Sequence, residues 1–280
     1  MTASDLSPAL RSVERVPPAR EYLRDAWAYR DFMVSLALAD ARSHHVDTAL
    51  GNLWQLLNPA LLIGIYYLIF GVIFDVTRGL DNFIGFLAIG VFMFTFTRRS
   101  MASGARAILN NRPLMQSIRF PRIVLPLATV LAEFFTFLPS VAVIFLVAIA
   151  TGESVGPSWL IVFPLILVQL VFNAGLAMGA SRLTARFRDL EELLPFALRL
   201  WFYTSGVLYP VDRVGEALGQ TWQRVFEANP AHVYIAICRD ALLDERISAY
   251  QWSLALGWAG ITGLVAFVFF KGHELEYGNG

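Results

Sequence analysis

The sequence predicts an all-α integral membrane protein with six transmembrane helices, on three observations. Of its 280 residues, 56% are hydrophobic and only 16% are charged, whereas soluble domains carry about 25% charged residues. Six apolar stretches are candidates to cross a bilayer, which takes roughly 17–25 residues of helix. They cover approximately residues 53–74, 82–97, 123–150, 157–181, 193–210 and 251–270. The polar sequence that remains is too short to cover six such stretches in a soluble core.

Two of these stretches contain signals that refine the prediction. Asn58 and Pro59 suit a helix N-cap and a first helical turn. We therefore expect the first span proper to cover about residues 58–74. In the fourth stretch, Gly175 and Gly179 have the spacing of small residues that lets two helices approach closely.

Two spans each hold one charged residue, Glu133 in the third and Arg199 in the fifth. An ionised carboxylate inside a span costs about 2.5–3.5 kcal/mol unless it is paired or hydrated. Arg199 is one candidate partner for Glu133. A watery cavity or a subunit interface beside Glu133 is the alternative.

The distribution of basic residues predicts the orientation of the chain. With both termini in the cytoplasm, sixteen basic residues lie in the inner segments and five in the outer ones. Cytoplasmic loops carry such an excess of Lys and Arg, so we expect both termini inside. Residues 1–24 lack the apolar core of a signal peptide, and the first span is expected to direct insertion.

The cytoplasmic ends of the chain are expected to differ in structure. Residues 1–20 resemble a flexible tail, and residues 272–280 form a second tail. Residues 21–52 mix polar and apolar side chains, which is typical of an amphipathic helix on the inner membrane surface. The same pattern would suit a helix that packs on a partner.

The segment from Arg98 to Arg122 is purely cationic, with six arginines and no acidic residue. Anchoring of the topology would account for the arginines alone. It does not account for the breaks at Pro113 and Pro121, nor for the apolar residues around them. We therefore expect a cytoplasmic loop containing a short helix that docks on a partner. Its apolar side chains are Leu109, Leu114, Met115, Ile118 and Phe120.

The outer segment, residues 211–250, is expected to contain two short helices. The first has an apolar face at helical spacing, formed by Val211, Val214, Leu218, Trp222 and Val225. The second begins at Asn229 and Pro230. These helices lie at the outer interface, dip into the membrane as re-entrant helices, or form a surface hairpin.

Several kinds of chemistry have no signature in the sequence. A phosphate-binding P-loop needs a lysine followed by Ser or Thr, but the only lysine, Lys271, precedes Gly272. The single cysteine, Cys238, cannot form an internal disulfide, and no Cys/His spacing fits a metal site. The net charge of +0 gives no indication of a nucleic-acid partner. We therefore expect a protein without catalytic residues, a metal site or a cofactor of its own, in which the energy for any transport comes from outside the chain.

Four motifs, taken together and in order, resemble those of one family. They are LGNLWQLLNPAL at 50–61, IRFPRIVLPLA at 118–128, RFRDLEELLPFALRLWFYTSGVLYP at 186–210 and NPAHVYIAICRDALL at 229–243. On these motifs the chain is similar to the membrane subunits of bacterial ABC exporters for lipid-linked polysaccharides, such as O-antigen, teichoic acid and mycobacterial galactan.

The resemblance implies a transporter made of two copies of this chain and two separate ATPase subunits, which bind ATP and Mg²⁺. It places the protein in the bacterial cytoplasmic membrane, surrounded by membrane lipids. It also implies that the cationic segment carries a coupling helix that sits in a cleft of the ATPase. The docking residues would be Leu109, Arg112, Leu114, Met115, Ile118, Arg119 and Phe120.

The resemblance further implies that spans one, two and five line a channel between the two copies. Aromatic side chains suit a sugar polymer there because they offer flat apolar faces to the CH groups of sugar rings. The candidates are Tyr66, Tyr67, Phe70, Trp201, Phe202 and Tyr203. Packing or lipid-facing positions are the alternative for each of them. The outer helices would form an exit gate, with Trp222 and Tyr234 as candidates.

Two other functions stay open from the sequence. One is an ABC permease that exports drugs or lipids, and the other is a non-transporting membrane scaffold of a glycan-assembly complex. A neighbouring ATPase gene would favour a transporter over a scaffold. Neighbouring glycosyltransferase genes would favour polysaccharide over drugs or lipids as the substrate.

Overall fold

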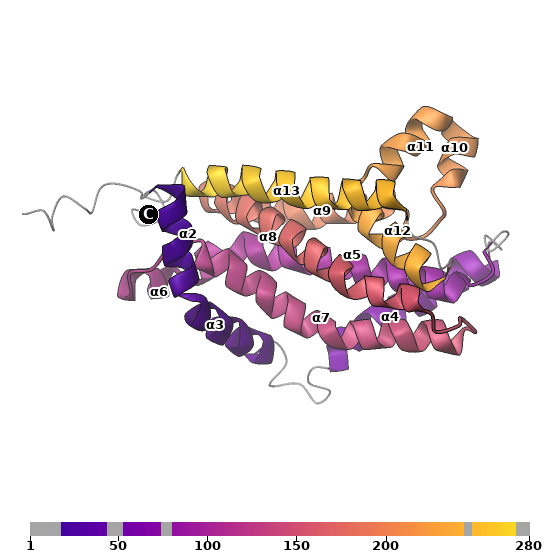
Figure 1. Ribbon diagram of the computed structural model, residues 1–280, viewed down its shortest axis with the longest axis horizontal. Coiled ribbons are helices and arrows are strands. Elements are labelled where there is room, and N and C mark those ends of the chain that lie inside the picture. The colour runs from indigo at the N-terminus through magenta and orange to yellow at the C-terminus, as the bar shows by residue number, and fades with distance from the viewer. Residues whose placement is uncertain (1–17, 44–52, 74–79, 244–247, 273–280) are drawn as a thin grey trace, which may run out of the picture.

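The protein is an elongated bundle in which four long helices run along the long axis (Figure 1). The computed structural model describes residues 18–43, 53–73, 80–243 and 248–272. The long helices are α5 (Phe83–Asn110), α7 (Val124–Ala150), α8 (Val162–Arg186) and α13 (Ala249–Lys271). Within these described ranges all regular structure is helical and no strand occurs, which confirms the predicted all-α class.

Helix α5 lies at the centre of the bundle and packs against α7, α8 and α12 (Pro230–Leu242). A Cβ on Gly104 of α5 would overlap the backbone and side chain of α8. A Cβ on Gly175 of α8 would lie 2.7 Å from the carbonyl carbon of Thr262 in α13. The predicted close approach at Gly175 is therefore confirmed. A Cβ on Gly179 would meet its nearest atom at 4.0 Å, so this position does not require glycine.

Among the described residues, five helical stretches are long and apolar enough to cross a membrane. Three of them are α5, α7 and α13. A fourth, Leu56–Ile73, joins α4 (Trp54–Tyr66) to the π-helix η3 (Tyr67–Ile73), and a fifth, Pro157–Arg186, joins the 3-10 turn η4 (Pro157–Ile161) to α8. Large apolar side chains of α4 and α13 stay exposed on the bundle surface. Exposed apolar surface of this extent fits contact with lipid or with another protein chain.

The remaining expected span, residues 193–210, is not one continuous helix. Its helix, α9 (Leu190–Thr204), has 15 residues and measures about 22 Å at 1.5 Å per residue. That is shorter than the hydrocarbon core of a bilayer, which is about 30 Å thick. The chain turns beyond α9 at Gly206, whose φ of +63° is adopted readily by glycine and rarely by other residues.

The first helix also begins earlier than expected. Helix α4 starts at Trp54, so Pro59 lies inside it and Asn58 is not its N-cap. A proline inside a helix removes one backbone hydrogen bond. The apolar segment stays helical around that loss because other backbone arrangements would leave more groups unpaired in lipid.

Helix α5 is longer than expected and continues beyond residue 97 to Asn110. No proline interrupts this stretch before Pro113, and helices tolerate the residues in it. Arg98, Arg99 and Arg106 therefore belong to α5 and not to a loop. The short helix of the cationic segment is α6 (Arg112–Ser117).

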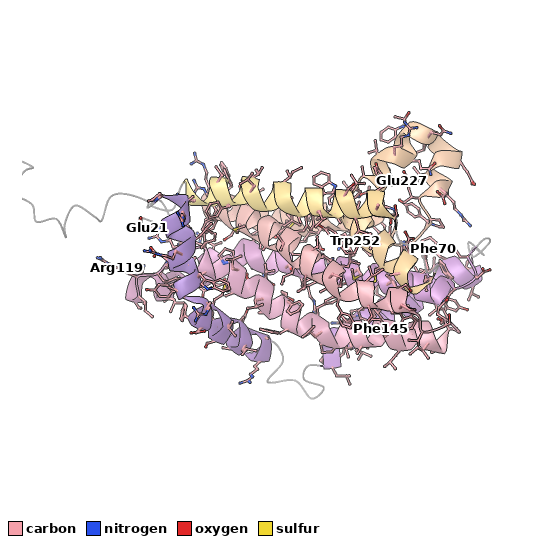
Figure 2. All side chains as sticks on the ribbon, viewed as in Figure 1. Glu21, Phe70, Arg119, Phe145, Glu227 and Trp252 are labelled. Atoms are coloured by element: carbon pink, nitrogen blue, oxygen red, sulfur yellow. The ribbon has the colours of Figure 1, made fainter. Side chains whose placement is uncertain are left out.

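Helices α2 (Ala19–Ala28) and α3 (Arg30–Ser43) lie with α6 at one end of the bundle (Figure 1). Figure 2 shows Glu21 and Arg119 at this end, and Glu227, Phe70, Trp252 and Phe145 in the opposite half of the molecule. Helix α3 packs along α7. The expected surface-helix region thus contains two helices, while most of the expected N-terminal tail, residues 44–52 and the C-terminal tail lie outside the described residues.

Buried Tyr22 fixes α2 to the bundle. Its ring centroid lies 6.2 Å from that of Phe267 in α13. Its hydroxyl oxygen accepts a hydrogen bond from the backbone N–H of Ile123, 3.4 Å away. One side chain therefore links α2 to the last helix and to the start of α7.

The outer segment contains three short helices, α10 (Asp212–Leu218), α11 (Gln220–Glu227) and α12 (Pro230–Leu242). The expected single helix over residues 211–225 is wrong, because Gly219 with a φ of +94° separates α10 from α11. Helices α10 and α11 project from the end of the bundle opposite α2 (Figure 1). Helix α12 begins after Asn229, as predicted, and packs against α13 and α5 inside the bundle.

Candidate functional site

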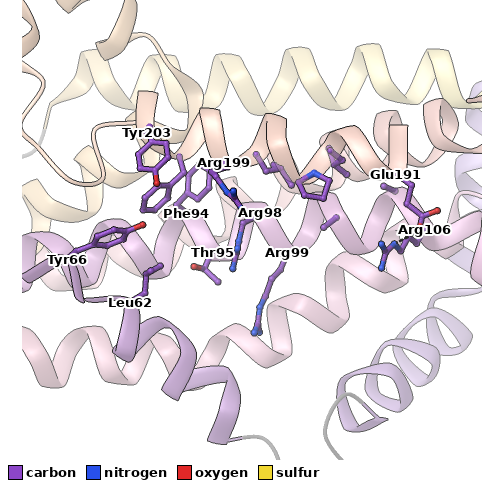
Figure 3. Close-up of a pocket in the computed structure, with 16 residues that line it drawn as sticks. Leu62, Tyr66, Phe94, Thr95, Arg98, Arg99, Arg106, Glu191, Arg199 and Tyr203 are labelled. Atoms are coloured by element: carbon purple, nitrogen blue, oxygen red, sulfur yellow. Dashed lines mark ion pairs between the residues drawn. The ribbon is translucent and has the colours of Figure 1, made fainter. Parts of the chain in front are cut away.

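A cavity of about 420 Å³ lies between α4, α5 and α9 (Figure 3). Helix α5 contributes one face, because its lining residues recur three or four positions apart. Helix α9 contributes one face for the same reason. The lining residues are Leu62, Tyr66, Phe94, Thr95, Arg98, Arg99, Ala102, Ala105, Arg106, Glu191, Leu194, Pro195, Leu198, Arg199, Phe202 and Tyr203.

One part of the cavity is an aromatic wall, formed by Tyr66, Phe94, Phe202 and Tyr203. The rings of Tyr66 and Phe202 stack with centroids 5.8 Å apart. Phe94 meets Phe202 edge-on at 5.2 Å. These contacts join α4, α5 and α9 and hold flat apolar surfaces at the cavity.

Another part of the cavity is a cationic cluster, formed by Arg98 and Arg99 of α5 and Arg199 of α9. Arg98 and Arg199 are exposed and Arg99 is partly exposed, so their charges face an accessible space. Beyond them, Arg106 Nε lies 2.6 Å from Glu191 Oε1, an ion pair that joins α5 to the start of α9. In Figure 3 the cationic cluster lies between the two tyrosines and this ion pair.

The six predicted channel residues fall into two groups. Tyr66, Phe202 and Tyr203 line the cavity. Behind them, the Phe70 ring packs 6.2 Å from Tyr66, the Tyr67 ring packs 6.4 Å from Phe83, and Trp201 points into the bundle.

Trp201 links α9 to the outer segment. Its indole N–H donates a hydrogen bond of 2.8 Å to Asn229 Oδ1. The same oxygen accepts from the backbone N–H of Ala231 and caps α12, while Asn229 Nδ2 donates to the Thr204 carbonyl at 3.0 Å. One asparagine therefore couples the end of α9 to the beginning of α12.

The two predicted intramembrane charges lie in different surroundings. Glu133 is buried between α5 and α7, where Ser103 Oγ donates to its carboxylate at 2.6 Å. Arg99 borders the same narrow gap. Arg199 lines the cavity on α9, and no ion pair joins it to Glu133 in the described part of the chain. The serine supplies the polar contact for which Arg199 was a candidate.

The predicted docking residues are divided between two directions. Met115 packs on a small core of α2, α5 and α13 side chains. The Phe120 ring lies 5.5 Å from Phe32 of α3. Leu109 and Leu114 are partly buried, while Arg112, Ile118 and Arg119 are exposed.

The contacts of residues 119–120 tie this segment to the N-terminal helices. Tyr29, between α2 and α3, donates from its hydroxyl to the Arg119 carbonyl at 3.1 Å. Its ring lies 6.4 Å from Phe120. A force on α6 would therefore reach α2 and α3 as well as α5 and α7.

The two predicted gate residues differ in exposure. Trp222 is exposed on α11. Tyr234 is fully buried on α12 and donates a hydrogen bond of 2.8 Å to the Ala255 carbonyl in α13. The first is available for a contact with another molecule, and the second holds α12 in the bundle.

Arg239 is buried and hydrogen-bonds to the backbone of two other segments, a role that was not predicted. Its buried guanidinium group donates to the Phe86 carbonyl through Nε at 3.2 Å and Nη2 at 2.9 Å. It also donates to the carbonyls of Gly206 and Val207, each at 2.9 Å. Arg239 thus satisfies backbone groups of the irregular segment that follows α9. The signal in the sequence is the motif at 229–243, which contains Arg239, but that motif assigned the arginine no structural role.

Comparison with known proteins identifies the family. The family description "ABC-2 type transporter" matches residues 43–243, a range that contains the cavity, α6 and the outer helices. The chain belongs to the ABC-2 type transporter family.

Three curated relatives have the same name, O-antigen export system permease protein RfbA. The protein of Myxococcus xanthus is 31% identical over 194 residues, which is 69% of this chain and 73% of the relative. One protein of Klebsiella pneumoniae is 29% identical over 232 residues, 82% of this chain and 87% of the relative. A second from that organism is 30% identical over 242 residues, 85% and 91% respectively. The predicted resemblance is thereby confirmed.

Membership in the family establishes the kind of protein. The chain is the membrane permease subunit of an ABC transporter, a multi-pass membrane protein and not an enzyme. In such transporters the nucleotide is typically bound by a separate ATPase subunit, so an ATP-binding partner is implied.

Proposed function

We propose that this permease exports a lipid-linked polysaccharide across the bacterial cytoplasmic membrane. The observation that carries the proposal is the cavity between α4, α5 and α9, where an aromatic wall adjoins a cationic cluster. Aromatic faces accept successive sugar rings without binding any one of them tightly. The three relatives named O-antigen export permeases support the same substrate class.

The transporter contains two copies of this chain and two ATPase subunits, which bind ATP and Mg²⁺. The accessible lining of the cavity supports a channel formed between the two copies, each contributing one cavity. Helix α9 and the irregular segment after it together form the fifth of six crossings in chain order. Arg239 satisfies the carbonyls of Gly206 and Val207, which a continuous helix would have paired. Six crossings put both termini on the same side of the membrane, and the excess of basic residues in the inner segments assigns that side to the cytoplasm.

The coupling helix is α6. Its exposed first residue, Arg112, and the exposed residues Ile118 and Arg119 just after it contact the ATPase, with Leu109 and Leu114 at the edge of the contact. Met115 and Phe120, which face inward, transmit the movement to the N-terminal helices. At the other end, α10 and α11 form the outer gate and Trp222 contacts the emerging polymer. Tyr234 holds the gate to α13 through its hydrogen bond.

Within the channel, Tyr66, Phe202 and Tyr203 contact the polymer. Phe70 supports the aromatic wall from η3, because its ring packs on Tyr66. Tyr67, also in η3, packs on Phe83 and holds η3 to α5. Trp201 keeps α9 aligned with the gate through Asn229. Glu133, with its serine partner, acts in the packing of α5 on α7.

Reconstitution with the ATPase subunit tests the function. We expect ATP-dependent movement of lipid-linked glycan in proteoliposomes, and accumulation of that glycan inside cells depleted of the pair. The Tyr203→Ala variant should lower export at least several-fold with unchanged assembly, because it removes an exposed ring of the aromatic wall. Phe163→Ala on α8, a phenylalanine exposed outside the cavity, is the matched control.

Other outcomes of this experiment identify the alternatives. ATP-driven movement of a drug or a phospholipid, without movement of glycan, would point to the other kind of ABC permease. Stable assembly without any ATP-driven movement would point to a scaffold. Either result would contradict the proposed export of polysaccharide.

A further inference from the structure

The cationic cluster concentrates three positive charges in one cavity, and the buried carboxylate of Glu133, which shares a narrow gap with Arg99, is hydrogen-bonded to Ser103 and forms no ion pair with them among the described residues. Arg98, Arg99 and Arg199 line one cavity, and the described residues offer none of them an ion pair. Glu191, the only acidic residue in the cavity lining, already pairs with Arg106. The remaining charges are therefore available to an anion from outside the chain.

Unpaired arginines at membrane depth are costly, so they indicate a functional site. A guanidinium group presents several N–H donors in a fixed plane and matches the oxygens of a phosphate in a bidentate manner. Two of these groups come from α5 and one from α9. An anion between them would be held from two helices at once.

The depth of the cluster also fits a lipid headgroup. Along the axis of α5, Arg98 lies about 22 Å from Phe83, the first residue of the helix, at 1.5 Å per residue. The hydrocarbon core of a bilayer is about 30 Å thick. With Phe83 at the outer surface, the cluster lies just inside the inner boundary of the core, close to the phosphates of the inner leaflet.

We infer that the cationic cluster binds the phosphate or diphosphate that joins the lipid to the glycan in the export substrate. The inference rests on the proposed function and assigns the part of the substrate that enters the cavity first. The aromatic wall adjoins the cluster (Figure 3), so the first sugar lies against Tyr66 or Tyr203 while the phosphate lies between Arg98 and Arg199.

A binding measurement on the full-length chain alone tests this inference without transport. The chain is placed in nanodiscs of phosphatidylcholine and titrated with a polyprenyl diphosphate that carries one fluorescent sugar. The corresponding sugar-labelled polyprenyl ether, which lacks phosphate, is the matched ligand. We expect the diphosphate to bind at least tenfold more tightly than the ether.

Three variants locate the site. Arg98→Gln, Arg99→Gln and Arg199→Gln should each weaken binding of the diphosphate about tenfold, because each removes charge-assisted hydrogen bonds, and leave binding of the ether unchanged. Lysine at the same positions should retain part of the affinity. Arg224→Gln on α11, an exposed arginine outside the cavity, is the control and should bind as the unmodified chain does. The Tm of each variant, compared with that of the unmodified chain, checks that the variant is folded.

The contrary outcomes are distinct. Equal binding of diphosphate and ether, or full affinity in all three glutamine variants, would overturn the inference. Equal competition by phosphatidylglycerol would assign the site to bulk phospholipid and overturn it as well. ATP-driven export by the reconstituted pair together with full affinity in the variants would leave the proposed function standing and remove only this inference. Strong phosphate-dependent binding without ATP-driven export would leave the phosphate site standing and contradict the proposed function.

Discussion

At the scale of single residues, Arg239 stabilises the chain where helix α9 ends. Its guanidinium group makes four hydrogen bonds to three backbone carbonyls. The carbonyls of Gly206 and Val207 follow the end of α9 and have left the regular helix. Gly90 leaves room for the guanidinium group, since a Cβ there would lie 2.6 Å from Nη2.

Replacing Arg239 with methionine should therefore destabilise the protein strongly. Methionine keeps a long apolar side chain but leaves the carbonyls of Gly206 and Val207 unpaired, at about 1–3 kcal/mol each. We expect a lower Tm in detergent and less folded protein in the membrane. Arg224→Met on exposed α11 is the matched control and should leave the Tm unchanged, and equal Tm values for both variants would contradict the role of Arg239.

Residue-scale predictions from the sequence were limited by the rotation of each helix. Trp201, Phe202 and Tyr203 are consecutive aromatic residues, and all three were candidates for the channel. In the structure Phe202 and Tyr203 line the cavity, whereas Trp201 points to Asn229. A helix turns by about 100° per residue, so neighbours face different directions, and only the packing of α9 decides which direction is the cavity.

At the scale of elements, the segment around α6 has one exposed face and one face that packs on the N-terminal region. Ile118 is exposed, while Phe120 packs on Phe32 and Tyr29 of the N-terminal region. The outer face is exposed and is the one that we propose contacts the ATPase, whereas the inner face links the α6 segment to the N-terminal region. Changes on the two faces should therefore differ in their effects.

We expect Ile118→Asp to reduce co-purification of the ATPase about tenfold, which corresponds to about 1.4 kcal/mol, without lowering the Tm. The aspartate places a charge in an apolar contact. Phe120→Ala should lower both the Tm and ATPase association, since it removes the inner contact. Leu218→Asp, an exposed leucine on α10 at the opposite end, is the control. Normal ATPase recovery with Ile118→Asp would place the docking surface elsewhere.

The elements themselves were largely predictable, but their ends were not. Long apolar runs indicated α4, α7, α8 and α13 because a span of this length has few soluble alternatives. The end of α5 was placed at residue 97 because Arg98 and Arg99 resemble the charged boundary of a span. The helix instead continues to Asn110. Charged residues indicate where a span leaves the apolar part of the membrane, but they do not end the helix. Arg98, Arg99 and Arg106, which were expected in a loop, therefore lie on α5 and line the cavity.

At the scale of the whole molecule, one feature allows the orientation to be measured directly. The single cysteine of the sequence, Cys238, is fully buried on α12. A reagent that attacks accessible thiols should leave the unmodified chain unlabelled. Cysteines introduced at exposed positions therefore report their own side of the membrane without removal of the native residue.

The proposed topology predicts opposite results for the two ends of the bundle. Gln116 on α6 and Thr221 on α11 are both exposed and lie at opposite ends (Figure 1). In intact spheroplasts, a membrane-impermeant maleimide should label Thr221→Cys and not Gln116→Cys. After the membrane is opened, both should react to a similar extent. Labelling of Gln116→Cys from outside would invert the topology, and α6 could then not reach an ATPase in the cytoplasm.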